Sequence, residues 1–412
     1  MDIKKKTLNC ARGFKRFSRR LAGFFKKLGT EKNLRYVLNL YLFDFLWNSA
    51  AGRYLVRMSG GRIPRYPVFL EIEVTTRCNL KCLICEHTYW KEPSRDMSLE
   101  QFRSIVDQFR PLCWIGLTGI GESFINPAFL KMLEYVKRRK VFVELYDTFY
   151  FIDRRTASKL IDLKVDKMFV SLDAATKETY ERIRCGSDFE RVIGNIRTLL
   201  ELKKERGARY PELAFHFIAN RLNYREIPDY VDLIISLCGE TPVRAQFTRM
   251  LHNFRETENL FIEIPPEIIA EAKRRARGTP VTLIWNEDVP AVKPPISQCT
   301  AWTMPFIFVT GEVINCCASN EANARNFQKK HGFGNVFEQR FREIWNSKGY
   351  RDFRNRVLSG RVPAACIDCP IFAVKPPQAK PVASRSVSTT PLRNASENNI
   401  SLHEPSVKRV KK

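Results

Sequence analysis

The sequence predicts an α/β protein built on an open or partial (β/α)6 barrel, similar in architecture to a TIM barrel, with a small cysteine-containing domain behind it. Between residues 69 and 250, short runs rich in β-branched and aromatic residues alternate with longer helical runs. This alternation is typical of repeated βα units around a parallel sheet. The chain has 412 residues, 44% of them apolar, which is enough to bury one large core and a smaller one. Several of its 12 cysteines are grouped at short spacings typical of metal ligands.

The alternating pattern gives six strands with helices between them. Strands are expected at 69–75, 114–118, 141–146, 167–172, 213–218 and 243–247. Helices are expected at 99–109, 128–139, 191–205 and 224–237. In such sheets the reactive side chains collect at the carboxyl ends of the strands.

The chain divides into five segments around this core. They are a basic amphipathic segment at 1–68, the barrel at 69–250, a bridge at 251–298, a second cysteine region at 299–372 and a basic tail at 373–412. The bridge is predicted to contain a helix at 266–277 and a strand at 281–285. The tail is rich in Pro, Ser, Lys and Asn and poor in large apolar residues, so we expect it to be disordered.

The N-terminal segment carries about half of the formal net charge of +25. Residues 1–68 hold 16 Lys and Arg against 3 Asp and Glu, a net charge of +13. This charge implies contact with a polyanion. Apolar side chains recur at helical spacing with Lys and Arg between them, which suits a helix lying in an anionic membrane interface: Phe14, Phe17, Leu21, Phe24, Phe25 and Leu28.

Two alternatives exist for this segment. The helix could pack on the catalytic domain with its basic face in water, or the charge could serve nucleic acid. No recognisable nucleic-acid module accompanies the charge, so no specific nucleic-acid partner is expected. The apolar run at 36–47 is too short to cross a bilayer, which needs ~20 residues. We expect a cytoplasmic protein, with peripheral attachment to the inner membrane surface as a further possibility.

The first expected strand leads directly into three cysteines, Cys78, Cys82 and Cys85, in a C-x3-C-x2-C array. Three thiolates on one loop can hold three irons of a cubane cluster, and the fourth iron is then open to a small chelating molecule. A tetrahedral zinc site is the alternative, and it needs a fourth ligand that His87 could supply.

A glycine-rich turn follows the second strand, at 118–127. Its glycines, Gly119 and Gly121, let the backbone approach a ligand closely, and Glu122 offers a carboxylate to an ammonium group. The turn lies one βα unit after the cysteine loop, so both belong to the same edge of the sheet.

These motifs resemble those of the radical S-adenosylmethionine (radical SAM) superfamily over residues 69–372. The cysteine array after an E-x-T-x-x strand matches the hallmark motif of the family, although Ile84 stands where many members have an aromatic residue. The resemblance implies a 4Fe-4S cluster on Cys78, Cys82 and Cys85 that binds SAM. It also implies that the glycine turn is the family's Gly-Gly-Glu motif. Glu122 then binds the methionyl amine of SAM, and Gly119 or Gly121 occupies the position of a glycine of the motif.

A third element, after the fourth strand, resembles the family's S-L-D … I-R … G pattern. The resemblance places Ser171 and Asp173 near the ribose of SAM and Arg184 near its carboxylate. The alternative is a plain turn from strand to helix in which Asp173 is a local cap.

The second cysteine region contains Cys299, the adjacent pair Cys316 and Cys317, and Cys366-x-x-Cys369. A hairpin turn at 310–311 is expected to bring Cys299 and one of the pair onto neighbouring strands, with Cys366 and Cys369 closing the site. Four thiolates can hold zinc or a complete 4Fe-4S cluster. The region resembles the SPASM/twitch extension of radical SAM enzymes, which implies one auxiliary 4Fe-4S cluster, with Cys316 favoured over Cys317 by its spacing from Gly311.

The resemblance implies an enzyme that reductively cleaves SAM to a 5′-deoxyadenosyl radical and abstracts hydrogen from a substrate, with electrons from a reductant protein such as flavodoxin or ferredoxin. The single auxiliary cluster favours a net oxidation or bond-forming modification of a small-molecule or membrane-associated metabolite. The alternatives are a peptide-modifying maturase and a zinc protein that binds nucleic acid, which would leave the glycine turn without a role. The sequence indicates no catalytic residue beyond these groups.

Overall fold

The computed structural model describes residues 38, 41–42, 45–46, 49–63, 66–89, 91–110, 112–250, 255–285, 295–299, 301–316, 325–367, 369 and 372. All of them belong to one compact unit, Met1–Lys375. The predicted helix at 13–28 and the predicted tail at 373–412 lie outside these residues.

A large sheet forms the core, with strands in the order β11-β10-β1-β3-β4-β5-β7-β8-β9. Its bounds are β1 Phe69–Ile72, β3 Trp114–Leu117, β4 Phe142–Asp147, β5 Lys167–Ser171, β7 Glu212–Ala219, β8 Val243–Arg249, β9 Val281–Trp285, β10 Phe306–Ile307 and β11 Val313–Ile314. A separate two-stranded ribbon pairs β2, Lys81–Cys82, with β6, Arg184–Cys185.

The predicted α/β fold is confirmed. From β1 to β9 each neighbouring pair of strands in the sheet is parallel, and the six predicted strands are β1, β3, β4, β5, β7 and β8. The predicted strand at 281–285 joins the same sheet as β9. All six carboxyl ends therefore meet at one edge, where the motif loops emerge.

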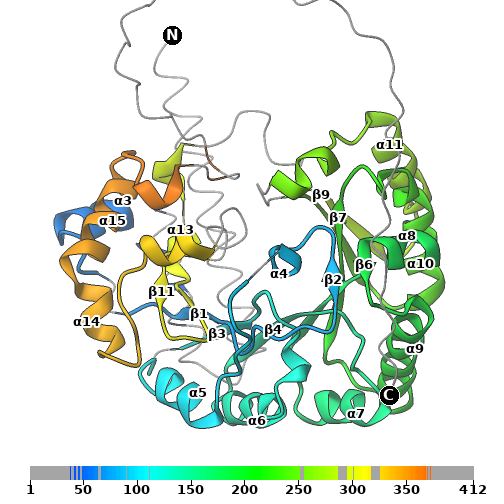
Figure 1. The fold of residues 1–412 in the computed structure, drawn as a ribbon, viewed down its shortest axis with the longest axis horizontal. Coiled ribbons are helices and arrows are strands. Elements are labelled where there is room, and N and C mark those ends of the chain that lie inside the picture. Colours follow the sequence, from blue (N-terminus) through cyan, green and yellow to red (C-terminus); the bar gives the residue numbers. More distant parts are fainter. Residues whose placement is uncertain are drawn as a thin grey trace, which may run out of the picture. The chain divides into compact units, whose positions relative to one another are not determined.

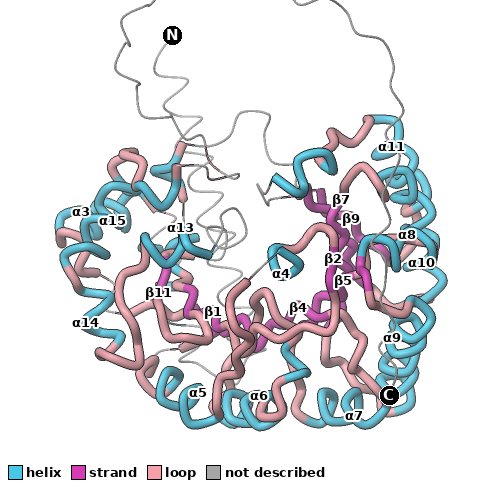
Figure 2. Tube along the Cα trace, viewed as in Figure 1, coloured by secondary structure: helices cyan, strands magenta, loops and turns pink. Residues whose placement is uncertain are grey.

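Helices cover the outer face of the curved sheet, and Figures 1 and 2 show α5, α6, α7, α9 and α10 along it. Each buries an apolar stripe, as in α6 with Phe129, Met132 and Val136. The helices are α3 Ala50–Met58, α4 Glu86–Tyr89, α5 Leu99–Val106, α6 Phe129–Arg138, α7 Arg154–Asp162, α8 Lys177–Ile183, α9 Phe189–Glu205, α10 Ile227–Cys238, α11 Pro266–Arg275, α13 Arg325–Lys330, α14 Phe341–Asn346 and α15 Lys348–Leu358.

The C-terminal cysteine region begins as an extension of the barrel sheet. β10 pairs in parallel with β1, and β11 folds back antiparallel on β10. The turn between them contains Gly311, whose φ of 92° is favourable for glycine, so the predicted hairpin is confirmed. The prediction that Cys299 lies on a strand of this hairpin is wrong. Cys299 instead ends the 3-10 helix η5, Ile296–Gln298, which follows Pro295.

The last part of the basic N-terminal segment forms α3, which packs against α15. Val56 is fully buried there, while Tyr54, Leu55 and Met58 are 62%, 47% and 68% exposed. The guanidinium of Arg354 on α15 donates to the carbonyl of Gly61 at 2.7 Å and holds the end of this segment. This part of the segment thus packs on the C-terminal cysteine region and still presents apolar side chains to solvent.

Candidate functional site

The cysteine loop is anchored at its start by Thr75 and Arg77. The Thr75 hydroxyl donates to Asp96 at 2.6 Å, and Arg77 forms an ion pair with the same carboxylate at 2.8 Å. The backbone N–H of Arg77 donates to Thr75 Oγ1 at 3.0 Å. These bonds fix the turn that carries the chain from the carboxyl end of β1 to the first cysteine.

The loop brings its three cysteines together. Cys82 is buried and Cys78 and Cys85 are half-buried, around an apolar cluster that includes Leu80 and Ile84. Burial raises the pKa of the Cys78 thiol to about 11, and it also raises the pKa values of the Cys82 and Cys85 thiols. The three thiols lie so close together that a negative charge on one raises the pKa of its neighbours.

This thiol set fits an iron-sulfur cluster. All three are free thiols, and metal binding releases their protons by replacing them with iron. Among the described residues, no three His, Cys, Asp or Glu side chains converge as the ligands of one metal ion. Thiolates that each bind a different iron of a cubane have no such single point of convergence.

The glycine turn lies directly against the cysteine loop. A Cβ atom on Gly119 would lie 2.5 Å from the Glu73 side chain, and one on Gly121 would lie 2.3 Å from the Thr75 carbonyl oxygen. The backbone N–H of Glu122 donates to the Arg77 carbonyl at 2.8 Å. Both glycines are therefore needed for close packing of the two loops, in addition to any contact with a ligand.

We expect Gly121→Ala to destabilise the protein by about 1–3 kcal/mol, because the new methyl group overlaps rigid backbone. Thermal unfolding of the apo-protein measures this. Gly194→Ala is the matched control, since nothing lies within 4 Å of its added Cβ and alanine favours a helix interior such as α9. Equal melting temperatures for the two variants would contradict the packing role.

Glu122 belongs to a buried acidic group that the sequence did not reveal. Its carboxylate accepts from the Thr148 hydroxyl at 2.7 Å and from the Thr148 N–H at 3.2 Å. Asp147, at the end of β4, is buried beside it; burial and then the charge of Glu122 raise the pKa of Asp147 well above its ordinary value. Asp147 therefore holds a proton readily. The only sequence signal for this pair is its place at a strand's carboxyl end.

Asp173 and Arg184 form a buried ion pair at 2.5 Å. The other Asp173 oxygen accepts from the Ile218 N–H at 2.7 Å. Arg184 lies opposite Cys82 in the ribbon of β2 and β6. Burial alone lowers the pKa of Arg184, but the negative charge of Asp173 raises it, so the side chain stays charged. The structure thus ties these two predicted SAM contacts to each other and to the cysteine loop.

Ser171 ends β5 and is half-buried on the inner face of the barrel, in register with His216 of β7. His216 shares a hydrogen bond of 2.9 Å with the Thr248 hydroxyl, and its ring lies edge-on to Tyr146. Tyr146 stacks on Phe169 at 4.3 Å. Burial lowers the pKa of His216 to about 4, so its ring is neutral at physiological pH. These lumen residues were not identified from the sequence.

Helix α13 of the C-terminal region contacts the chain both before and after the three cysteines of the loop. Arg325 forms a buried ion pair with Glu73, just after β1, at 2.6 Å. The Arg325 N–H donates to Glu86, next to Cys85, at 2.8 Å, and Lys329 pairs with Glu92 at 2.9 Å. The barrel and the C-terminal region therefore meet at the cysteine loop.

Three of the predicted auxiliary ligands lie close together. Cys299, Cys366 and Cys369 are near enough to influence each other's ionisation, and burial raises the pKa of Cys299 to about 11 and of Cys366 to about 12. Cys316 follows β11 and lies near Tyr350 of α15, against which η5 also packs. Cys317 lies outside the described residues.

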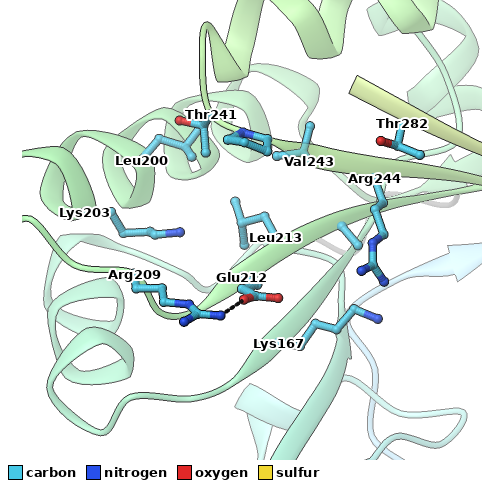
Figure 3. A pocket seen from close by; sticks show the side chains of 12 residues that line it. Lys167, Leu200, Lys203, Arg209, Glu212, Leu213, Thr241, Val243, Arg244 and Thr282 are labelled. Atoms are coloured by element: carbon cyan, nitrogen blue, oxygen red, sulfur yellow. Dashed lines mark hydrogen bonds and ion pairs between the residues drawn. The ribbon is translucent and has the colours of Figure 1, made fainter. Parts of the chain in front are cut away.

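A pocket of about 430 Å³ lies at the opposite, amino end of the strands (Figure 3). Lys167, Lys203, Arg209 and Arg244 surround Glu212, which pairs with Arg209 at 3.3 Å. No predicted site residue lines it.

No helix in the described parts of the chain is long and apolar enough to cross a bilayer.

Comparisons with known proteins match two parts of the chain to known domain families. The model of the radical SAM superfamily matches residues 72–234, and the model of SPASM, an iron-sulfur cluster-binding domain, matches residues 299–370. A tungsten-containing aldehyde ferredoxin oxidoreductase cofactor-modifying protein of Pyrococcus furiosus is 24% identical over 336 residues, which cover 73% of this chain and 86% of that protein.

The mycofactocin maturase MftC of Mycolicibacterium smegmatis is 21% identical over 321 residues, covering 74% of this chain and 76% of the relative. Streptococcus suis SuiB, in a crystal structure bound to S-adenosylmethionine, shares the fold with a TM-score of 0.57 at 15% identity, covering 78% of this chain and 75% of SuiB.

The two matched models imply a SAM-binding 4Fe-4S cluster, auxiliary iron-sulfur binding and SAM itself as cofactors. The three neighbouring thiols of the loop after β1 are suitable ligands for such a cluster. The separate group of cysteines before and after the hairpin is suitable for the auxiliary iron-sulfur group. The chain belongs to the radical SAM superfamily and carries a C-terminal SPASM iron-sulfur domain.

Proposed function

We propose that this protein cleaves SAM at a cluster held by Cys78, Cys82 and Cys85 and uses the product to abstract hydrogen from a substrate. When bound, the cluster supplies the electron that splits SAM into methionine and a 5′-deoxyadenosyl radical. The observation that carries this proposal is the close packing of the glycine turn on the cysteine loop, which puts Glu122 beside the thiols.

The protein's own residues position SAM and keep water out. Glu122, steadied by Thr148, offers a carboxylate to the methionyl ammonium, and the raised pKa of the buried Asp147 disfavours a second negative charge there. Arg184 and Asp173 hold the ribbon that carries Cys82. Apolar side chains around the thiols exclude solvent from the reactive species, among them Leu80, Ile84, Ile183 and Met250.

For the substrate we propose a small molecule or cofactor precursor that enters the barrel and contacts Tyr146, His216 and Thr248. The relative from Pyrococcus furiosus, named for cofactor modification, supports this class. A peptide is the second candidate, which the similarity to a mycofactocin maturase supports.

We assign one auxiliary 4Fe-4S cluster to Cys299, Cys366, Cys369 and either Cys316 or Cys317. We also assign peripheral membrane attachment to residues 1–68.

The test is SAM cleavage by anaerobically reconstituted protein under a strong reductant, with 5′-deoxyadenosine and methionine as expected products. Glu122→Gln should weaken SAM binding about 10- to 100-fold, because a hydrogen bond to a charged group contributes about 1.5–3 kcal/mol. Its iron content should be unchanged.

Glu100→Gln, on the exposed surface of α5, is the control and should bind SAM normally. A protein that holds stoichiometric zinc without labile sulfide and leaves SAM intact would refute the proposed function.

A further inference from the structure

The outer side of the cysteine loop has a pocket of about 420 Å³ that reaches the first cluster cysteine. Cys78, Arg77, Lys81, His87 and Glu92 are among its lining residues. Arg77 and Lys81 are exposed, and Cys78 is half-buried, whereas Cys82 is buried. On this side the cluster site therefore lies close to solvent.

This surface carries an excess of positive charge. Its two partly exposed carboxylates are already neutralised, since Asp96 pairs with Arg77 at 2.8 Å and Glu92 pairs with Lys329 at 2.9 Å.

Three further cations, Lys81, Lys91 and Arg95, are exposed in the same loop region. Their side chains form no hydrogen bond or ion pair with any other residue that the structure describes. Nothing described on the protein itself neutralises them.

The proposed function requires one electron for each SAM molecule that is cleaved. Electron transfer slows steeply with distance, so a protein donor must approach the cluster where the least polypeptide covers it. Electron-transfer complexes are small and transient, and complementary charge guides the encounter. A donor for this face would need a negatively charged surface around its own redox group.

We propose that Arg77, Lys81, Lys91 and Arg95 form the docking face for an acidic one-electron carrier protein of the flavodoxin or ferredoxin class. This inference rests on the proposed function and adds the place at which the electron enters. The reduced carrier loses one electron, the cluster held by Cys78, Cys82 and Cys85 gains it, and no covalent bond changes in this step. Arg77 also anchors the loop through Asp96, so the test leaves it intact.

The test compares two reductants on the full-length holoprotein. The charge-reversal variant is Lys91→Glu with Arg95→Glu, and the matched control is Arg197→Glu with Lys204→Glu, which makes the same change on exposed residues of α9. With reduced flavodoxin at low salt, the docking variant should cleave SAM at least about tenfold more slowly than the control, since charge steering accelerates association by about 10- to 1,000-fold. With titanium(III) citrate, both variants should match the wild type.

Binding provides a readout that does not depend on activity. Titration calorimetry should show weaker flavodoxin binding for the docking variant, and added salt should reduce the difference between it and the control. Equal rates and equal affinities for the two variants would overturn the docking face. If the wild type fails to cleave SAM even with titanium(III) citrate, the proposed function is wrong, and this inference is rejected with it.

Discussion

The triple variant Cys78→Ala, Cys82→Ala, Cys85→Ala is expected to lose all SAM cleavage and to keep about four of the about eight irons that two 4Fe-4S clusters provide. The three thiols lie on one loop in one apolar cluster, separate from Cys299, Cys366 and Cys369. Removing them leaves the second thiol group with its ligands. Iron and labile sulfide analysis after anaerobic reconstitution gives the measurement.

A matched control replaces cysteines that lie outside both groups. Cys113 and Cys238 are buried cysteines of the barrel, and Cys113→Ala with Cys238→Ala should retain the full iron content and SAM cleavage. If the triple variant lost all of its iron, the two thiol groups would not bind clusters independently. If the triple variant kept all of its iron, the cysteine loop would bind no cluster.

Arg184→Ala is expected to destabilise the apo-protein by about 3–5 kcal/mol, because it leaves the Asp173 carboxylate buried without its cation. The side chains of Arg184 and Asp173 are 9% and 0% exposed, so solvent cannot replace the lost partner. Since Arg184 lies opposite Cys82, cluster assembly should also fall. Denaturant unfolding and iron content measure the two effects.

The double variant Arg184→Ala with Asp173→Asn separates pairing from ligand binding. If the main role of Arg184 is to neutralise Asp173, the double variant should be more stable than Arg184→Ala alone, because no buried charge remains. If Arg184 mainly contacts SAM, Arg184→Ala should be as stable as the wild type and only SAM affinity should change. That result would contradict the structural role inferred here.

The sequence was sufficient for the barrel because its βα units are marked by local patterns. Alternating apolar runs located all six predicted barrel strands, and the C-x3-C-x2-C spacing identified the loop after β1. The strand at 281–285 was also predicted, but its place in the main sheet beside β8 depends on a long-range pairing that no local pattern encodes.

The contacts that join distant segments could not be predicted in this way. Arg325 meets Glu73 across 252 positions of the chain, and Thr148 meets Glu122 from a neighbouring strand end. The pairing of Asp173 with Arg184 was missed because the motif suggested that both face a ligand. Cys299 was misplaced because the hairpin pattern begins only at Phe306, beyond a 3-10 turn.

The central claim is that SAM binds directly to a cluster held by Cys78, Cys82 and Cys85. Electron-nuclear double resonance of the reduced holoprotein with SAM labelled with ¹⁵N at its amino group tests it most directly. The account predicts a ¹⁵N coupling to the reduced cluster, which should disappear in the triple cysteine variant although its auxiliary cluster remains. A reduced cluster signal that SAM leaves unchanged, with no ¹⁵N coupling, would contradict the account.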